Sequence, residues 1–326
     1  MDYDNDGILD IISGSYDPGD IYLIRGLGEG KYDNVESLVD ENFNPLVHHP
    51  VEIEKFLELE GDSDAANSDE AIQFRVASFG SWPAMIDWDD DGDLDMLIGS
   101  FSGKMFLRMN IGTRDEPDFS KESIPVLAGG VALKESGHAN PVVADWDSDG
   151  MKDLIVGSSN GRISWYRNVG SEEKPEFASA SVLVPATGAS KGSIQFRFPG
   201  EEIRPGGRTQ ICVTDYNGDG LLDILAGDYA TVMPLKKVTE DEYALINEQI
   251  MKRRKAEQQQ AVVQEKFFAK YQAGELTSEE IQKEMESLGF QEEMMDAFFK
   301  IKKFTTLKDE FETHSHVWVY LRKPTQ

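Results

Sequence analysis

Residues 145–157, DWDSDGMKDLIVG, decide the fold of this chain because their pattern occurs four times in 326 residues. Each copy starts with a nine-residue loop that has Asp or Asn at positions 1, 3, 5 and 9 and Gly at position 6. We refer to residues 2–10, 87–95, 145–153 and 215–223 as loops 1 to 4. A short apolar segment closed by Gly follows every loop, and such segments are typical of β-strands. The loops are therefore expected to join strands.

The side chains of these loops are suited to a hard cation. Carboxylates at alternating positions can converge on one ion that prefers about six to eight oxygens, and Gly at position 6 permits a sharp reversal. The alternative, an EF-hand, needs Glu at position 12, where this chain has Ser13, Ile98, Val156 and Ala226. The candidate metal ligands are Asp2, Asp4, Asp6, Asp10, Asp87, Asp89, Asp91, Asp95, Asp145, Asp147, Asp149, Asp153, Asp215, Asn217, Asp219 and Asp223.

A third apolar element follows the first three loops, at residues 19–25, 103–108 and 161–167. It is missing at the corresponding place after loop 4, but a similar element occurs at residues 315–320. We therefore expect a long insertion between the second and third strands of the fourth repeat. The uneven spacing of the loops fits a four-stranded unit with variable outer connections better than a parallel β-helix, which needs a shorter and stricter period.

The loops and their flanking strands resemble the FG-GAP/VCBS repeats of integrin α-chain propellers and of many bacterial secreted proteins. The resemblance covers residues 1–228 and 315–323, and the whole pattern also looks like planctomycete-type repeat proteins. It implies an all-β fold: a β-propeller with about four visible blades and an α-helical insertion in the last blade. It further implies about four structural Ca²⁺ ions, one in each loop, with Asn217 lowering the charge of the fourth site.

The expected domains are propeller repeats at 1–233, the helical insertion at 234–314 and the returning propeller strand at 315–326. The first repeat lacks a strand before loop 1, and the fourth lacks a final strand. We expect a fragment of a larger propeller, the alternative being one composite blade shared by the two ends.

The insertion has a helical composition, rich in Glu, Gln, Lys, Met and Phe, with no proline between Pro234 and Pro324. Thr239 with Glu242 and Thr277 with Glu280 form capping-box patterns, and the first helix is expected from about residue 240 to 272. Its apolar side chains are expected to close a helical hairpin on itself. The alternative is that its Met and Phe side chains form a partner or homo-oligomer surface.

The resemblance places the metal loops on one propeller face and the segments that lead into the innermost strands on the other. Those segments suggest five candidate ligand-binding residues: Trp82, His138, Asn140, Arg208 and Gln210. Trp82 could stack on a sugar ring while the others supply hydrogen bonds. The alternative is that Trp82 packs between blades and the polar side chains are only hydrated.

Composition excludes several classes of function. The formal net charge of −28 argues against nucleic acid and anionic membranes as partners. No apolar run approaches the roughly 20 residues of a membrane span, and the first 30 residues lack a secretory-signal pattern. The single cysteine, Cys212, is expected to be buried, and His48–His49 and His314 with His316 lack a third metal ligand at useful spacing. No common hydrolase or nucleotide-binding motif occurs.

Three functions remain. The first is a calcium-stabilised recognition module of an extracellular, periplasmic or cell-surface protein that binds carbohydrate or protein. The second is a lyase-like enzyme that acts on polysaccharide in an axial cleft with His138 and Arg208, since some polysaccharide lyases resemble this propeller class. The third is an assembly protein that docks through the helical insertion.

Overall fold

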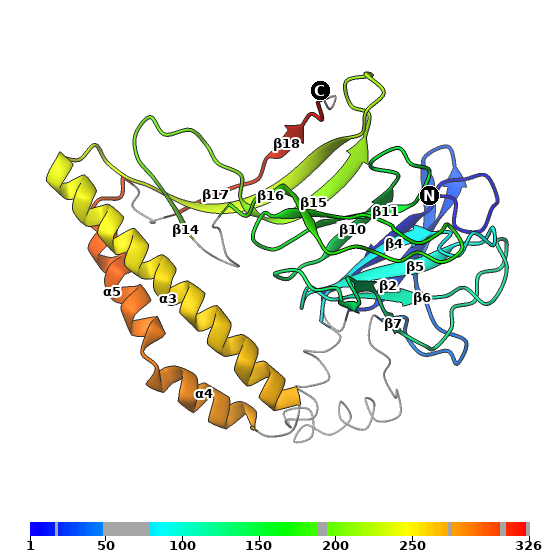
Figure 1. The fold of residues 1–326 in the computed structure, drawn as a ribbon, viewed down its shortest axis with the longest axis horizontal. Coiled ribbons are helices and arrows are strands. Elements are labelled where there is room, and N and C mark those ends of the chain that lie inside the picture. The colour runs from blue at the N-terminus through cyan, green and yellow to red at the C-terminus, as the bar shows by residue number, and fades with distance from the viewer. Residues whose placement is uncertain (17–18, 48–78, 188–193, 273–275, 307–310, 324–326) are drawn as a thin grey trace. The chain divides into compact units, whose positions relative to one another are not determined.

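The structure is a computed structural model that describes residues 1–16, 19–47, 79–187, 194–272, 276–306 and 311–323 (Figure 1). The chain is mostly β, with several antiparallel sheets. It divides into two compact units. The first, the repeat unit, contains residues 1–191, 205–229 and 315–326; the second, the helical unit, contains residues 192–204 and 230–314. The helical unit thus also takes in residues 192–204, which lie far from the expected insertion.

Repeats 2 and 3 each form a four-stranded antiparallel sheet whose strands follow in chain order. The strands of repeat 2 are β4 (Ser81–Ile86), β5 (Asp95–Ser100), β6 (Met105–Arg108) and β7 (Ile124–Pro125). Those of repeat 3 are β10 (Asn140–Ala144), β11 (Asp153–Gly157), β12 (Ile163–Tyr166) and β13 (Ser181–Val184). Loops 2 and 3 therefore join the first and second strands of their sheets, as expected. A small hairpin of β8 (Leu127–Ala128) and β9 (Val131–Ala132) lies between the two repeats in the chain.

Repeats 1 and 4 depart from this plan. Among the described residues, repeat 1 has three strands, β1 (Ile11–Gly14), β2 (Ile21–Gly28) and β3 (Lys31–Ser37). Because β1 follows loop 1, these correspond to the second, third and fourth strands of repeats 2 and 3. In repeat 4, β15 (Gly207–Thr214) pairs with the long strand β16 (Asp223–Pro234), which also pairs antiparallel with β18 (Val317–Tyr320). The strand expected at residues 315–320 is thus present and pairs with the second strand of its repeat.

The second strands of repeats 2 and 3 are buried on both faces because their central residues are apolar. Met96, Leu97 and Ile98 in β5 are fully buried, as are Leu154, Ile155 and Val156 in β11. Each of these strands supplies side chains to the cores shared with the repeats before and after it. Full burial of such a side chain contributes about 1.5–3 kcal/mol, so neighbouring repeats stabilise one another.

Three repeats also touch the next one through a glycine that closes the second strand. The gap there leaves no room for a side chain, because an added Cβ would collide with a backbone carbonyl of the following repeat. The Cβ···O distances would be 2.0 Å for Gly14 to Ser81, 1.9 Å for Gly99 to Ala139 and 2.6 Å for Gly157 to Thr209. A Cβ added to Gly227, the corresponding residue of repeat 4, would lie 3.8 Å from its nearest described neighbour, the carbonyl oxygen of Gln210. The sequence pattern of a closing Gly therefore reflects close packing in the first three repeats only.

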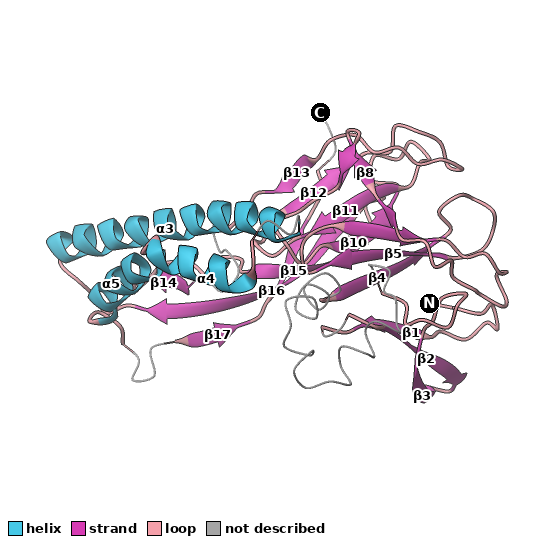
Figure 2. Cartoon of the chain, turned by 90° about the horizontal axis from the view of Figure 1, so that it is seen from below, coloured by secondary structure: helices cyan, strands magenta, loops and turns pink. Residues whose placement is uncertain are grey.

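The helical unit contains α3 (Glu240–Gln272), α4 (Ser278–Ser287) and α5 (Phe290–Lys302), with α5 packed along α3 (Figure 2). Its strands are β14 (Ile194–Arg197), parallel to the end of β16, and β17 (Glu312–His314), antiparallel to β16. Ile246 of α3 and Phe298 of α5 belong to one core cluster, so the helices pack on each other as expected. The same cluster includes Phe196 of β14 and Met233 of β16, so the helices also pack on strands, which was not expected. Both capping boxes form, at Thr239 and Thr277. Among the described helices, none is long and apolar enough to cross a membrane.

The expectation for Cys212 is wrong, since its side chain is exposed. The burial of β15 alternates, with Ile211 directed into the core and Cys212 directed away from it. A strand that is covered on only one face shows this period of two, which an apolar run in the sequence hides.

Candidate functional site

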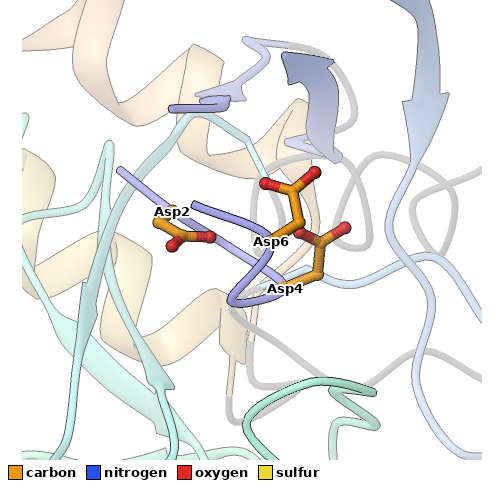
Figure 3. A group of neighbouring side chains, drawn as sticks. All are labelled: Asp2, Asp4 and Asp6. Carbon is orange, nitrogen blue, oxygen red and sulfur yellow. The ribbon is translucent and has the colours of Figure 1, made fainter. Parts of the chain in front are cut away.

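Among the described residues, carboxylates converge in three of the four loops, and in each of these loops three of the four predicted positions come together. Figure 3 shows Asp2, Asp4 and Asp6 projecting from loop 1. In each of three loops, one carboxylate oxygen from each of three aspartates lies within 4.8 Å of the other two. The sets are Asp2, Asp4 and Asp6 in loop 1, Asp87, Asp89 and Asp91 in loop 2, and Asp145, Asp147 and Asp153 in loop 3. Loop 4 has Asn217 at position 3 in place of a carboxylate.

Backbone hydrogen bonds hold each loop in the same shape. The position-1 carboxylate accepts a bond from the N–H of the position-6 glycine, at 3.1 Å in loop 1 and 2.9 Å in loop 4. The position-5 carboxylate accepts one from position 7, at 2.8 Å from Ile8 to Asp6. The position-6 glycines have φ between 84° and 96°, where a side chain would be strained. Gly is therefore required for the reversal that brings positions 1 and 5 together.

The position-9 carboxylate has a structural role, which we call the clamp, and in loop 3 it also belongs to the converging set. In every repeat one of its oxygens accepts the N–H of position 2. The other accepts an N–H just beyond the third strand in repeats 2 to 4, and the N–H of Gly26, inside β2, in repeat 1. In loop 3, Asp153 Oδ2 accepts from Trp146 at 3.2 Å and Oδ1 from Asn168 at 2.7 Å. Asp10, Asp95 and Asp223 bond in the same way. The clamp fastens the start of the loop to the third strand.

Loop 2 concentrates negative charge in a partly buried place. Burial raises the pKa of Asp95 to about 7, against the opposing effect of its two backbone donors. Burial, and then the neighbouring Asp91, also raise the pKa of Asp89 and Asp93. A bound cation would offset this repulsion.

The loops also contain buried carboxylate oxygens without a hydrogen-bond partner. They are Oδ1 of Asp2, Asp4, Asp87, Asp89, Asp93 and Asp147. A buried oxygen that lacks a donor is unfavourable unless something else satisfies it, and an ion bound by oxygen ligands would do so. The donor set is all oxygen, which suits Ca²⁺ or Mg²⁺ rather than a thiolate-binding metal. The residues present therefore fit the ion that the loop pattern implies.

Residues 145–226, which span loops 3 and 4 and the strands between them, match the family model of an FG-GAP-like repeat. The chain contains an FG-GAP-like repeat. A comparison of the whole chain with curated proteins found no significant match. The matched FG-GAP-like repeat contains the clamps of Asp153 and Asp223 and the contact of Gly157 with Thr209.

Outside the matched repeat, the candidate ligand residues Trp82 and His138 lie in an aromatic cluster. Their ring centroids are 5.1 Å apart, and His138 lies 4.5 Å from Phe101 and 6.1 Å from Tyr16. The side chain of His138 is only 1% exposed, whereas Tyr16 is 48% exposed. His138 has a φ of 49°, and its N–H bonds to the carbonyl of Phe101. Its ring is thus fixed beneath the cluster rather than open to solvent.

Arg208 and Gln210 line a pocket of about 400 Å³ in the repeat unit with Tyr229 and His316. The guanidinium of Arg208 lies 5.3 Å from the centre of the Tyr229 ring. Asp228 forms one wall, and its carboxylate accepts bonds from the N–H of Gly206, the N–H of His316 and the indole of Trp318. Asn140, the remaining candidate, instead accepts the N–H of Ile211 at 2.7 Å and so joins repeats 3 and 4.

Of the two histidine pairs, only His314 and His316 are described, and their carboxylate neighbours are in different units. His48 and His49 lie outside the described residues. His314 Nε2 lies 3.0 Å from Glu312 in the helical unit, and His316 Nδ1 lies 3.9 Å from Asp228 in the repeat unit.

Sequence reasoning missed the cations that contact the loops. Arg114 donates to the carbonyls of Asp2 and Tyr3, Lys152 to that of Asp87, and Arg322 to that of Trp146. Each cation belongs to the repeat that follows the loop it contacts. Only Lys152 lies at a fixed loop position, so the sequence offered no common spacing for them.

Proposed function

We propose that this chain is a calcium-stabilised recognition module built on β-propeller blades, each loop holding one structural Ca²⁺. The observation that carries the proposal is the set of buried, partnerless carboxylate oxygens inside loops whose ligand atoms lie within 4.8 Å of one another. The FG-GAP-like repeat and the four-stranded sheets of repeats 2 and 3 support the propeller blades.

Bound Ca²⁺ would supply charge neutralisation and oxygen coordination. The protein's own residues prepare the site. Position 6 makes the reversal and position 9 clamps the loop. Positions 1 and 3 present oxygens together with position 5 in loops 1 and 2 and with position 9 in loop 3. An ion at about 100 times its dissociation constant stabilises the folded state by roughly 2.7 kcal/mol per site. The loops are partly exposed to solvent, and the millimolar calcium found outside cells can fill weak sites of this kind. This supports an extracellular, periplasmic or cell-surface location.

Ligand recognition is proposed for the ends of the strands away from the metal loops. Tyr16 and Trp82 offer ring faces, and Arg208, Gln210 and His316 offer hydrogen bonds in a pocket. Within the pocket the ring of Tyr229 lies beside these polar groups, and such a combination suits a carbohydrate ring or a protein side chain. The net charge of −28 supports a partner other than nucleic acid or an anionic membrane.

The test is calorimetry of chelator-stripped protein titrated with Ca²⁺, together with thermal melts. We expect up to about four equivalents and a rise in melting temperature, because the ion binds only the folded loops. Asp89→Asn and Asp90→Asn are matched variants, since the residues are adjacent but only Asp89 is in a converging set. Asp89→Asn should lose about one equivalent and Asp90→Asn none. Absence of both binding and calcium-dependent stability in the unaltered protein would refute the proposal.

A further inference from the structure

Two arginines form ion pairs with candidate metal-binding carboxylates of the loops. Arg25 bonds to Asp4 of loop 1, and it also bonds to Glu36 at 2.8 Å. Arg167 bonds to two carboxylates of loop 3, Asp147 at 2.5 Å and Asp149 at 2.8 Å. Arg25 lies within β2, and Arg167 directly follows β12.

Loop 2 has no such arginine. The corresponding residue of its repeat, Arg108, is 1% exposed and donates instead to the carbonyls of Val47, Ser120 and Lys121. Lys152 approaches loop 2, but its partners are the backbone carbonyl of Asp87 and the carboxylate of Asp90, which is outside the converging set. Within the described residues, no cation bonds to the three converging carboxylates of loop 2.

Among the described residues, no arginine side chain bonds to a carboxylate of loop 4 either, but this loop has Asn in place of one Asp. The amide of Asn217 donates to Asp219 at 3.0 Å, so an internal hydrogen bond uses an oxygen that an ion would need. Because Asn replaces Asp at position 3, loop 4 has three aspartates, whereas loops 1 and 3 have four each and loop 2 has six.

The unsatisfied oxygens give a second comparison of the loops. Among the converging carboxylates, loops 1 and 2 each have two buried oxygens without a partner, on Asp2 and Asp4 and on Asp87 and Asp89, and loop 3 has one, on Asp147. Loop 4 has none among the described residues, and its Asp215, Asn217 and Asp219 are exposed. These counts place loops 1 and 2 before loop 3 and loop 4 last, and the arginine contact of loop 1 places loop 2 before it.

We propose that the loops bind Ca²⁺ in the order 2, 1, 3, 4, and that Arg25 and Arg167 are resident cations which lower the affinity of loops 1 and 3. This rests on the proposed function, because it concerns the same ions. An incoming ion must take oxygens away from the guanidinium and then lie beside a positive charge, and both effects weaken binding. The module would therefore keep one filled loop at calcium levels that empty the others.

The sign of the arginine effect can be tested directly. Arg167→Gln should tighten binding at loop 3 by roughly fivefold, the size expected from one exposed ion pair of about 1 kcal/mol. Arg162→Gln is the matched control, since Arg162 is in the same repeat but bonds to no loop carboxylate in the described structure. If Arg167 instead orients Asp147 and Asp149 for the ion, Arg167→Gln will weaken binding, and the proposal is overturned.

Tryptophans at position 2 make the filling order visible. Loop 2 contains Trp88 and loop 3 contains Trp146, whereas loops 1 and 4 contain Tyr at that position. Tb³⁺ titrated into chelator-stripped protein, excited selectively through tryptophan, should emit first through Trp88 and later through Trp146. Trp88→Phe should therefore remove the early part of the signal and Trp146→Phe the late part, while Arg167→Gln should move the late part to lower Tb³⁺.

The outcomes separate the two proposals. Tb³⁺ emission and Ca²⁺ heats that fill all loops together, or an early signal lost in Trp146→Phe, would overturn the filling order and leave structural calcium standing. Absence of Ca²⁺ heats and of Tb³⁺ emission would overturn both.

Discussion

Repeats 3 and 4 use the same clamp over very different lengths of chain. Asp153 bonds to an N–H 15 residues away, and Asp223 bonds to one 99 residues away, at 2.7 and 2.8 Å. The whole helical hairpin lies between Asp223 and Arg322. The comparison teaches that the clamp depends on the pairing of β16 with β18 and not on the distance along the chain, so a repeat tolerates an insertion between its second and third strands.

The two repeats differ at the opposite end of the second strand. Gly157 packs against the next repeat, whereas Gly227 borders the open pocket beside Arg208. Side chains are excluded at the first place and have room at the second. This difference offers the largest expected effect.

Gly157→Ala should destabilise the repeat unit by about 3 kcal/mol, because the new Cβ would lie 2.6 Å from the Thr209 carbonyl and the backbone must shift. Gly227→Ala is the matched variant and should change stability by less than about 1 kcal/mol. Urea unfolding in saturating Ca²⁺, followed by tryptophan fluorescence, measures both. Equal losses would show that the two glycines do the same job.

Asp153→Asn and Asp223→Asn should each cost about 2 kcal/mol. An Asn side chain has one acceptor oxygen where the carboxylate has two, so one clamp N–H is left buried without a partner. The same urea experiment applies. A much smaller loss at Asp223 would mean that the long insertion leaves the clamp loosely closed, contrary to the comparison above.

Thr277→Ala should cost the helical unit about 1 kcal/mol, because it removes the side-chain acceptor of the capping box. Far-ultraviolet circular dichroism would show earlier loss of helix. Ca²⁺ binding heats should stay unchanged, since the clamp of repeat 4 does not use the helices. Thr313→Ala, at a position outside the helices, is the control.

The smallest expected effect is the pH dependence of stability in protein from which a chelator has removed Ca²⁺. Burial raises the pKa of Asp153 above its ordinary value. The folded state therefore holds this proton more strongly than the unfolded state, and the stability it contributes is present at low pH and lost as the pH rises through the folded pKa. The cost of Asp153→Asn should consequently shrink as the pH rises from about 4 towards neutrality. A cost that grows over this range would show that the carboxylate is ionised throughout.

Much of the fold could be predicted from local patterns. The loops, the strands that follow them and the first helix at residues 240–272 appear where composition and periodicity place them. Position 6 glycines and both capping boxes also behave as their local chemistry requires. These features depend on residues a few positions apart, which a single sequence displays.

Features that depend on pairing between distant strands could not be predicted. The contacts of Arg167 with loop 3 and of Arg322 with Trp146 follow from strand register, which spacing does not reveal. The second oxygen of each clamp has the same origin. Convergence of Trp82 with His138 was expected, but the burial of His138 depends on Phe101 in the preceding repeat. The propeller and its ions remain proposals.

The cations that contact the loops have a consequence for synthesis. Because a chain emerges from its N-terminus, each loop is made before the side chain that later holds its backbone. The carbonyls of Asp2 and Tyr3 gain their donor only when Arg114 has been made, and that of Asp87 only when Lys152 has been made. The carbonyl of Trp146 gains its donor only when Arg322 has been made. The last of these delays spans the whole helical insertion. A ribosome that stalls within the insertion would therefore present a third loop that has all its carboxylates but lacks the hydrogen bond from Arg322 to the Trp146 carbonyl.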